Sequence, residues 1–262
     1  ENVQGLMQRK CRPVRDDIMK KLEDAGYHVS YRLVNARAYG VPQNRLRTYI
    51  AGVHRDVPGV STFSLPADIG MMPLEALLEG DGPYLVEPED VELQALSHNS
   101  RENVIEAMGR LAPGPAYDWI LDDRQSQGWS ARKFVSTHRY SPCLTHGRSA
   151  GYWVGSRHRR LYISEGCRLQ ALRPELVSLP PLESTMWELL GNSMASCVVQ
   201  RILIRFLRLL RPSQRFEDPW ETGDAQRRLA VLAVPDPAPQ PALMAVPEAA
   251  ELQSEVSEEE DA

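Results

Sequence analysis

The fold is decided by residues 14–53, which read VRDDIMKKLEDAGYHVSYRLVNARAYGVPQNRLRTYIAGV. Apolar side chains recur every three or four positions over residues 14–25, which predicts a helix with one apolar face. Gly26 ends this helix. Residues 27–34 alternate and are rich in aromatic and branched side chains, which is typical of a strand, and residues 47–53 predict a second strand after a polar turn. A helix and strands at this density indicate an α/β sheet.

The rest of the chain divides into three stretches. Prolines and glycines recur between residues 58 and 137, which predicts a loop-rich insertion. Residues 138–211 again predict helices, the longest over residues 193–210, with Pro212 marking its end. The remaining residues are polar, acidic and rich in proline, which predicts a disordered tail. The predicted segments are therefore residues 1–57, 58–137, 138–211 and 212–262.

Composition narrows the class of protein. An apolar fraction of 42% is enough for a hydrophobic core. No stretch of eighteen residues is free of charge, so we expect no membrane span. Residues 212–262 hold twelve Asp or Glu against three Arg, a net charge of −9; since the whole chain carries −5, residues 1–211 carry +4. A mildly basic body is compatible with a nucleic-acid partner.

The cysteines and the start of the chain add two expectations. Cys11, Cys143, Cys167 and Cys197 are scattered, without a CxxC pair or a His at metal spacing. This argues against a metal site and a disulfide scaffold and suits a reducing compartment. The chain begins with Glu1 rather than Met and has no signal peptide, so we expect that further residues precede it.

Four short motifs follow one another in a fixed order. They are Glu1-Asn2-Val3, Gln43-x-Arg45-x-Arg47, Arg160-Leu161 with Glu165 and Arg168-Leu169-Gln170, and Gly191-Asn192-Ser193. Together they resemble motifs of the DNA cytosine-5 methyltransferases, and the segment Pro142-Cys-Leu-Thr145 also fits that family. The resemblance covers residues 1–55 and 137–211. It implies the C-terminal part of a Rossmann-like, S-adenosylmethionine-dependent α/β methyltransferase sheet with an inserted, loop-rich target-recognition region.

The resemblance implies catalytic roles for three residues. The family adds a thiolate to C6 of cytosine, and a carboxyl group at N3 stabilises the charge that develops on the ring. This role falls on Glu1, unless Glu1 is an exposed residue at a frayed terminus. Arg45 and Arg47 point to the same side of an extended chain and would orient the flipped cytosine; the alternatives are a solvated pair or an internal salt bridge.

The implied ligands are S-adenosylmethionine and double-stranded DNA. Asn192, Ser193 and Met194, at the predicted start of the long helix, would border the cofactor; the alternative is a plain helix cap. The implied DNA-binding residues are Asn2, Gln43, Arg132, Lys133 and Arg139. Of these, Gln43 is expected mainly to hold its loop through backbone hydrogen bonds. Glu165 and Arg168 are expected to pair with each other or with the insertion.

Two elements of the family are missing from this sequence. The family's nucleophile lies in a Pro-Cys motif upstream of Glu-Asn-Val, whereas Pro142-Cys143 follows Gln43-x-Arg45-x-Arg47 and is rejected as its equivalent. The glycine-rich cofactor loop is also absent. We therefore expect the isolated chain to be inactive and to need an N-terminal half from the same parent chain or from a partner subunit.

Other functions remain open at this point. The chain can be an inactive relative that binds DNA or regulates a methyltransferase, although Glu1 and the two arginines argue against it. It can also be an RNA cytosine-5 methyltransferase, since that enzyme keeps the same motifs. We expect the nucleus as its location in a eukaryote, and otherwise the cytoplasm or nucleoid.

Overall fold

The computed structural model describes residues 1–80, 91–110, 120–122, 139–146, 151–178, 180 and 182–231. Its central element is an antiparallel sheet in the order β1 (Asn2–Val3), β4 (Leu46–His54), β2 (Tyr27–Asn35). Strands β2 and β4 pair along their whole length, from Tyr27 opposite His54 to Asn35 opposite Leu46. The two strands predicted over residues 27–34 and 47–53 are confirmed.

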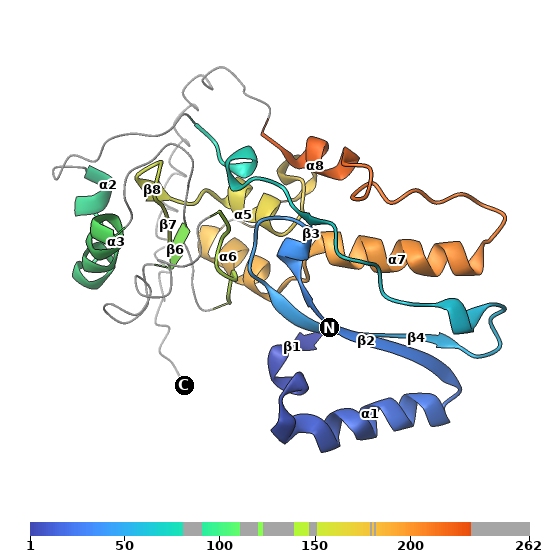
Figure 1. The fold of residues 1–262 in the computed structure, drawn as a ribbon. Coiled ribbons are helices and arrows are strands. Elements are labelled where there is room, and N and C mark those ends of the chain that lie inside the picture. Colours follow the sequence, from blue (N-terminus) through green and yellow to red (C-terminus); the bar gives the residue numbers. More distant parts are fainter. Residues whose placement is uncertain are drawn as a thin grey trace, which may run out of the picture. The chain divides into compact units, whose positions relative to one another are not determined.

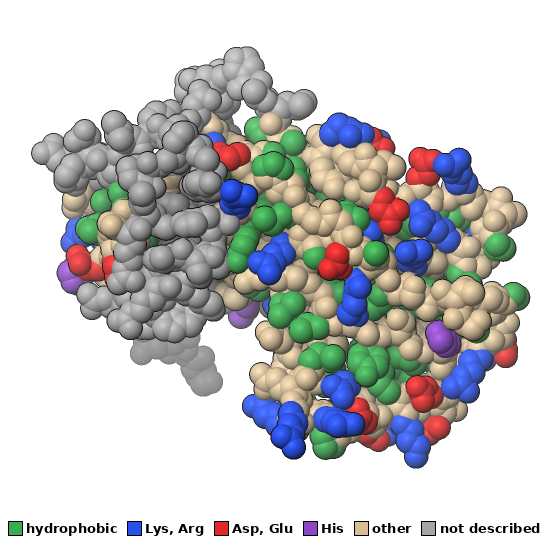
Figure 2. Space-filling model, viewed as in Figure 1, with side chains coloured by type: hydrophobic (Ala, Val, Ile, Leu, Met, Phe, Trp, Pro, Cys, Tyr) green, Lys and Arg blue, Asp and Glu red, His purple; other side chains and the backbone are tan. Residues whose placement is uncertain are grey.

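One helix packs on each side of this sheet (Figure 1). Helix α1 (Arg12–Asp24) confirms the helix predicted over residues 14–25 and follows two short turns, η1 (Gln4–Met7) and η2 (Arg9–Cys11). Charges of both signs mix on its outer surface (Figure 2), where Lys21 pairs with Asp17. Helix α7 (Ser196–Leu210) lies on the other side.

The segment between β2 and β4 pairs with the first part of the insertion. Turn η3 (Ala36–Ala38) leads into β3 (Tyr39–Gly40), which pairs in parallel with β5 (Gly70–Met71). Within residues 58–80 the described elements are the two-residue strand β5 and the single turns η4 (Val60–Thr62) and η5 (Leu74–Leu77). This agrees with the predicted loss of regularity after residue 57.

The later part of the insertion and the segment over residues 151–160 form a second, smaller sheet with two helices. Strands β6, β7 and β8 make an antiparallel sheet, and a small cluster of Leu93, Val104, Ala107 and Trp153 joins it to the nearby helices. The bounds of these elements are α2 (Val91–Gln94), α3 (His98–Arg110), β6 (Ile120–Asp122), β7 (Tyr152–Val154) and β8 (Arg159–Arg160).

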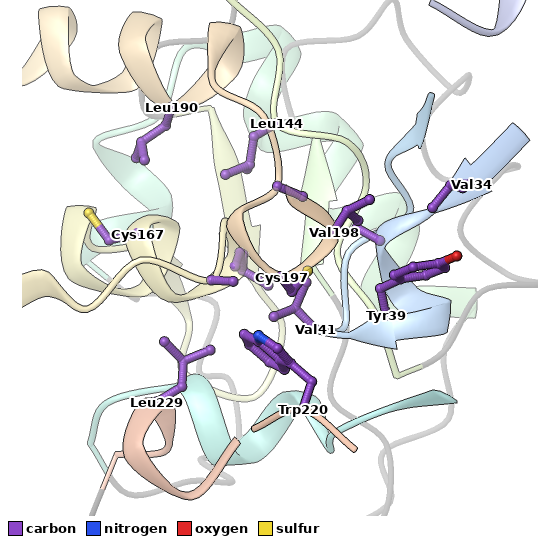
Figure 3. Close-up of a cluster of buried hydrophobic side chains, with 14 of the residues drawn as sticks. Val34, Tyr39, Val41, Leu144, Cys167, Leu190, Cys197, Val198, Trp220 and Leu229 are labelled. Atoms are coloured by element: carbon purple, nitrogen blue, oxygen red, sulfur yellow. The ribbon is translucent and has the colours of Figure 1, made fainter. Parts of the chain in front are cut away.

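The main hydrophobic core brings together residues far apart in the sequence (Figure 3). It receives side chains from β2, β3 and β4, from the helices after residue 160, and from the segment after α7. The remaining elements are α5 (Ile163–Leu169), η6 (Pro174–Leu176), α6 (Glu183–Asn192) and α8 (Asp224–Leu229). No helix in the described ranges is long and apolar enough to cross a membrane.

The predicted helix over residues 193–210 is wrong at its start. Gly191 and Asn192 end α6, and α7 begins only at Ser196. Gly191 is needed for close approach: a Cβ there would lie 2.3 Å from the backbone nitrogen of His146. A side chain at this position would therefore push residues 145–146 away from α6.

The predicted disordered tail is wrong for residues 212–231. This segment contains α8 and buries Trp220 and Leu229 in the main core. The acidic residues that suggested disorder include Asp218, which pairs with the buried Arg201. Residues 232–262 lie outside the described residues.

Glu165 anchors α5 to the insertion. Its buried carboxylate accepts hydrogen bonds from both Nη atoms of Arg159, at 2.9 and 2.7 Å, and from the backbone nitrogens of Glu79 and Tyr162. Arg168 binds Glu79 instead of Glu165. Of the two predicted pairings, the one with the insertion is therefore confirmed.

Replacing Glu165 with alanine should lower the free energy of unfolding by about 3–5 kcal/mol, because it leaves Arg159 and two amides without their buried acceptor. Urea denaturation of the purified chain measures this. Glu175→Ala is the matched control, since Glu175 is an exposed carboxylate paired with Arg173; it should cost less than about 1 kcal/mol. Equal losses in the two variants would contradict the anchoring role.

Candidate functional site

The first residues of the chain are held against the start of β4. Strand β1 pairs with β4, with Asn2 opposite Thr48 and Val3 opposite Arg47. This pairing places the Glu1 carboxylate 3.2 Å from Nε of Arg47 and 4.0 Å from Nε of Arg45. The side chain of Glu1 is only 11% exposed. The Glu1 side chain thus lies against the two arginines, although the residue as a whole, with its terminal backbone, is exposed.

Arg45 is buried, and its guanidinium is bound by the backbone around this site. Its side chain is 3% exposed, and its guanidinium donates to the backbone oxygens of Leu144 at 2.9 Å, Gly191 at 3.1 Å and Ser193 at 2.6 Å. Three segments thus meet at one cation. Its contacts to protein carbonyls correct the expectation that Arg45 itself faces a bound base.

Arg47 is the accessible cation of the pair. Its side chain is 20% exposed; it donates to the Leu46 carbonyl at 2.9 Å and contacts the Sγ of Cys143 at 3.5 Å. Arg45 directly precedes β4 and Arg47 lies within it, and as residues i and i+2 of extended chain both point toward Glu1. Arg45 is therefore held by backbone carbonyls of the protein, whereas Arg47 stays partly exposed beside Glu1.

Cys143 joins the site from a distant part of the chain. Its Sγ lies 3.4 Å from Nη1 of Arg45. The neighbouring Ser141 accepts a hydrogen bond from the Asn44 nitrogen at 2.8 Å and donates one to the Pro42 oxygen at 2.7 Å. Sequence spacing alone does not predict the contact between Cys143 and Arg45. The sequence feature that pointed to this region was the segment Pro142-Cys-Leu-Thr145.

Gln43 is a structural residue. It is fully buried, donates from Nε2 to the Leu169 oxygen at 2.7 Å, and accepts from the Leu144 nitrogen at 3.4 Å. Its burial corrects the assignment of Gln43 to DNA binding and agrees with the loop-holding role.

The other predicted DNA-binding residues are placed only in part. Asn2 and Arg139 are exposed, and Asn2 accepts a hydrogen bond from the Val3 nitrogen. Arg132 and Lys133 lie outside the described residues. Of the five residues predicted to bind DNA, two are therefore described with exposed polar side chains, Asn2 and Arg139.

The predicted cofactor residues lie in the break between α6 and α7. Ser193 donates from Oγ to the Leu190 oxygen at 2.9 Å, and its carbonyl binds Arg45. Nδ2 of Asn192 lies 3.1 Å from Nδ1 of His146, and Met194 is 49% exposed. Among the described residues, Asn192 and Met194 can thus supply one edge of a cofactor site but do not enclose one.

The N-terminus of α7 is closed to an anion. Ala195 caps it without a side-chain hydrogen bond and is buried, and the Ser196 nitrogen donates to the Gln170 oxygen at 2.9 Å. The expected capping by Asn192 or Ser193 is therefore wrong, because the helix begins one turn later. Within the described ranges no group of His, Cys, Asp or Glu could hold a metal ion.

The four thiols should differ sharply in reactivity. Burial raises the pKa of Cys167 to about 11 and that of Cys197 to about 12, while Cys11 and Cys143 are partly exposed. At pH 8 we expect two thiols to react with Ellman's reagent before unfolding, since the thiolate is the reactive form. Cys11→Ser and Cys143→Ser should each remove one. Rapid reaction of all four in the folded chain would contradict the structure.

Comparison with known proteins gives one consistent family. Residues 1–208 match the family model of the C-5 cytosine-specific DNA methylases. The type II methyltransferase M.BsuRI of Bacillus subtilis is 32% identical over 65% of this chain and 38% of its own length, and M.HpaII of Haemophilus parainfluenzae is 28% identical over 76% and 57%. The chain therefore spans roughly half the length of these relatives or less.

Solved structures include a similar one from S. pombe. Its Dnmt2 methyltransferase is 17% identical to this chain, with a TM-score of 0.45, covering 79% of this chain and 64% of that one. The family model covers most of the chain, and the four motifs quoted from the sequence all lie within the residues it matches. This chain belongs to the C-5 cytosine-specific DNA methylase family.

Proposed function

We propose that the intact protein methylates C5 of cytosine in double-stranded DNA and that Glu1 and Arg47 hold the reacting base. The observation that carries this proposal is the Glu1–Arg47 pair. The Glu1 carboxylate lies 3.2 Å from Nε of Arg47, and the Arg47 side chain is 20% exposed. The carboxyl group of Glu1, just before β1, and the cation of Arg47 on β4 match the polar edge of cytosine. Enzymes of this family take the methyl group from S-adenosylmethionine.

The reaction explains the need for these two groups. C5 of cytosine is a poor nucleophile until a thiolate adds to C6, and that addition puts negative charge on the ring at N3. We assign to Glu1 the proton that N3 receives, and to Arg47 the orientation of the ring oxygen. Both groups reach the base only after it leaves the helical stack.

We propose that the attacking thiol is none of the four cysteines of this chain. Cys167 and Cys197 are buried. Cys143 is held between the two arginines, on a segment that follows Gln43-x-Arg45-x-Arg47 in the sequence, and Cys11 has no proline before it. The 262-residue chain alone should therefore transfer no methyl group to DNA.

The cofactor would supply the methyl group and meet this chain along Asn192 and Met194. Their side chains are exposed beside the Ser193 carbonyl that binds Arg45. The same carbonyl links the proposed cofactor edge to the base site. For DNA, we propose phosphate contacts by Arg132, Lys133 and Arg139 on the strength of the sequence.

The experiment that tests this function supplies the intact gene product with methyl-tritiated S-adenosylmethionine and either duplex DNA or transfer RNA. We expect label in DNA, recovered as 5-methyldeoxycytidine after digestion. Label in transfer RNA alone would favour the RNA methyltransferase. A folded protein that labels neither nucleic acid would favour the inactive, DNA-binding relative.

A further inference from the structure

Residues 211–231, here called the C-terminal strap, follow the residues that match the family model. The strap nevertheless completes the main core. Trp220 and Leu229 are each 3% exposed, and the Val231 nitrogen donates to the Ala76 oxygen at 2.8 Å. A segment outside the matched domain is thus built into the same body as Glu1 and Arg47.

A buried ion pair fixes the strap to α7. The Arg201 side chain is fully buried, and its Nε lies 2.7 Å from Oδ2 of Asp218. The same guanidinium reaches Glu221 at 3.1 Å and donates to the Ala67 oxygen at 2.8 Å. The other Asp218 oxygen accepts from the Trp220 nitrogen at 3.0 Å. This network sets the position of the Trp220 backbone.

The Trp220 ring lies against the turn that precedes the two site arginines. Its Nε1 donates to Gln200 at 2.8 Å, and the ring lies beside Val41 and Cys197 (Figure 3). A Cβ at Gly40 would lie 2.3 Å from a ring carbon of Trp220. Gly40 has a φ of +120°, a conformation that favours glycine. The indole therefore packs directly on the backbone of β3.

The turn that follows Gly40 is fixed by hydrogen bonds to other parts of the chain. Gln43 is bound to the Leu169 oxygen, and the Asn44 nitrogen is bound to the Ser141 oxygen. Arg45 then binds residues 144, 191 and 193. The backbone from Gly40 to Arg45 is thus held by the indole at one end and by these hydrogen bonds at the other.

We propose that Trp220, through its contact with Gly40, is a positioning residue for Arg45 and Arg47. This rests on the proposed function. Without the indole, β3 can move into the space it leaves, and the turn carries the arginines with it. Small displacements of orienting groups are costly to catalysis, up to about 100-fold for 1 Å.

The test compares Trp220→Ala, Trp220→Phe and Leu229→Ala in the intact gene product. Leu229 is an equally buried strap residue in the same core, and it supplies no described contact to Gly40. Per folded molecule, we expect Trp220→Ala to lower kcat about 10- to 100-fold with little change in the KM for the cofactor. Trp220→Phe should restore most of kcat, and Leu229→Ala should leave it unchanged.

A second readout needs no activity. In the 262-residue chain, Trp220→Ala should speed amide hydrogen exchange at Asn44 and Arg45 at least tenfold, beyond its effect on the slowest core amides, whereas Leu229→Ala should not. If Trp220→Ala and Leu229→Ala behave alike in kcat and in exchange, the strap has only a structural role and the proposal fails. If the wild type lacks methyl transfer, the proposed function fails, while the exchange result still tests the positioning contact.

Discussion

Replacing Glu1 with glutamine in the intact protein should lower kcat/KM for methyl transfer by about 10²–10⁴-fold, the range expected for loss of a general acid. Glutamine keeps the shape of the side chain and a hydrogen-bonding oxygen but has no carboxyl proton to give to N3. Glu1 precedes the two-residue edge strand β1 and contributes no side chain to the main core, so the fold should be preserved. The measurement is the rate of tritium transfer at saturating cofactor, with the denaturation midpoint recorded beside it.

Glu23→Gln is the matched control for this variant. Glu23 is an exposed carboxylate on α1, so its replacement changes the charge equally without touching the site. It should retain wild-type activity. An active Glu1→Gln enzyme, with a rate within a few-fold of the control, would show that the carboxyl proton is not used.

Replacing Arg45 with alanine should lower the free energy of unfolding by about 3–5 kcal/mol, which is the expected loss when a buried cation leaves its partners unsatisfied. Three backbone carbonyls, those of Leu144, Gly191 and Ser193, lose their donor. They lie in two segments separated by almost fifty residues, so the loss also loosens their contact with β4. Urea denaturation of the purified chain measures the change.

Arg47→Ala provides the contrast, because it lies two residues along the same strand. Arg47 is more exposed and donates to one carbonyl within its own strand. We expect it to cost about 1 kcal/mol in stability while abolishing most of the methyl transfer. If the two variants are equally destabilised, the division between a framing and a ligand-facing arginine is wrong.

Local periodicity was enough to predict the elements near the N-terminus. The apolar spacing of residues 14–25 and the alternation of residues 27–34 are properties of adjacent residues, and both elements form as predicted. The Gln-x-Arg-x-Arg spacing also correctly placed Arg45 and Arg47 on one side of a strand.

Long-range contacts account for what the sequence could not predict. The burial of Arg45 depends on carbonyls 99 and 146 residues away in the sequence. The position of residues 212–231 depends on the main core and on the buried Arg201, which in the sequence looks like an interruption of an apolar helix. Gly191 resembled a helix start but is required by the backbone at residues 145–146. Each of these depends on a partner that the local pattern does not contain.

The central claim is that Glu1 and Arg47 act as one unit on the cytosine ring. A double-mutant cycle on methyl transfer with Glu1→Gln, Arg47→Ala and the combined variant tests it most directly. The account predicts that the double variant is about as slow as the slower single variant, because either change already disrupts the shared site. Losses that multiply across the two positions would mean that the groups act independently and would contradict the account.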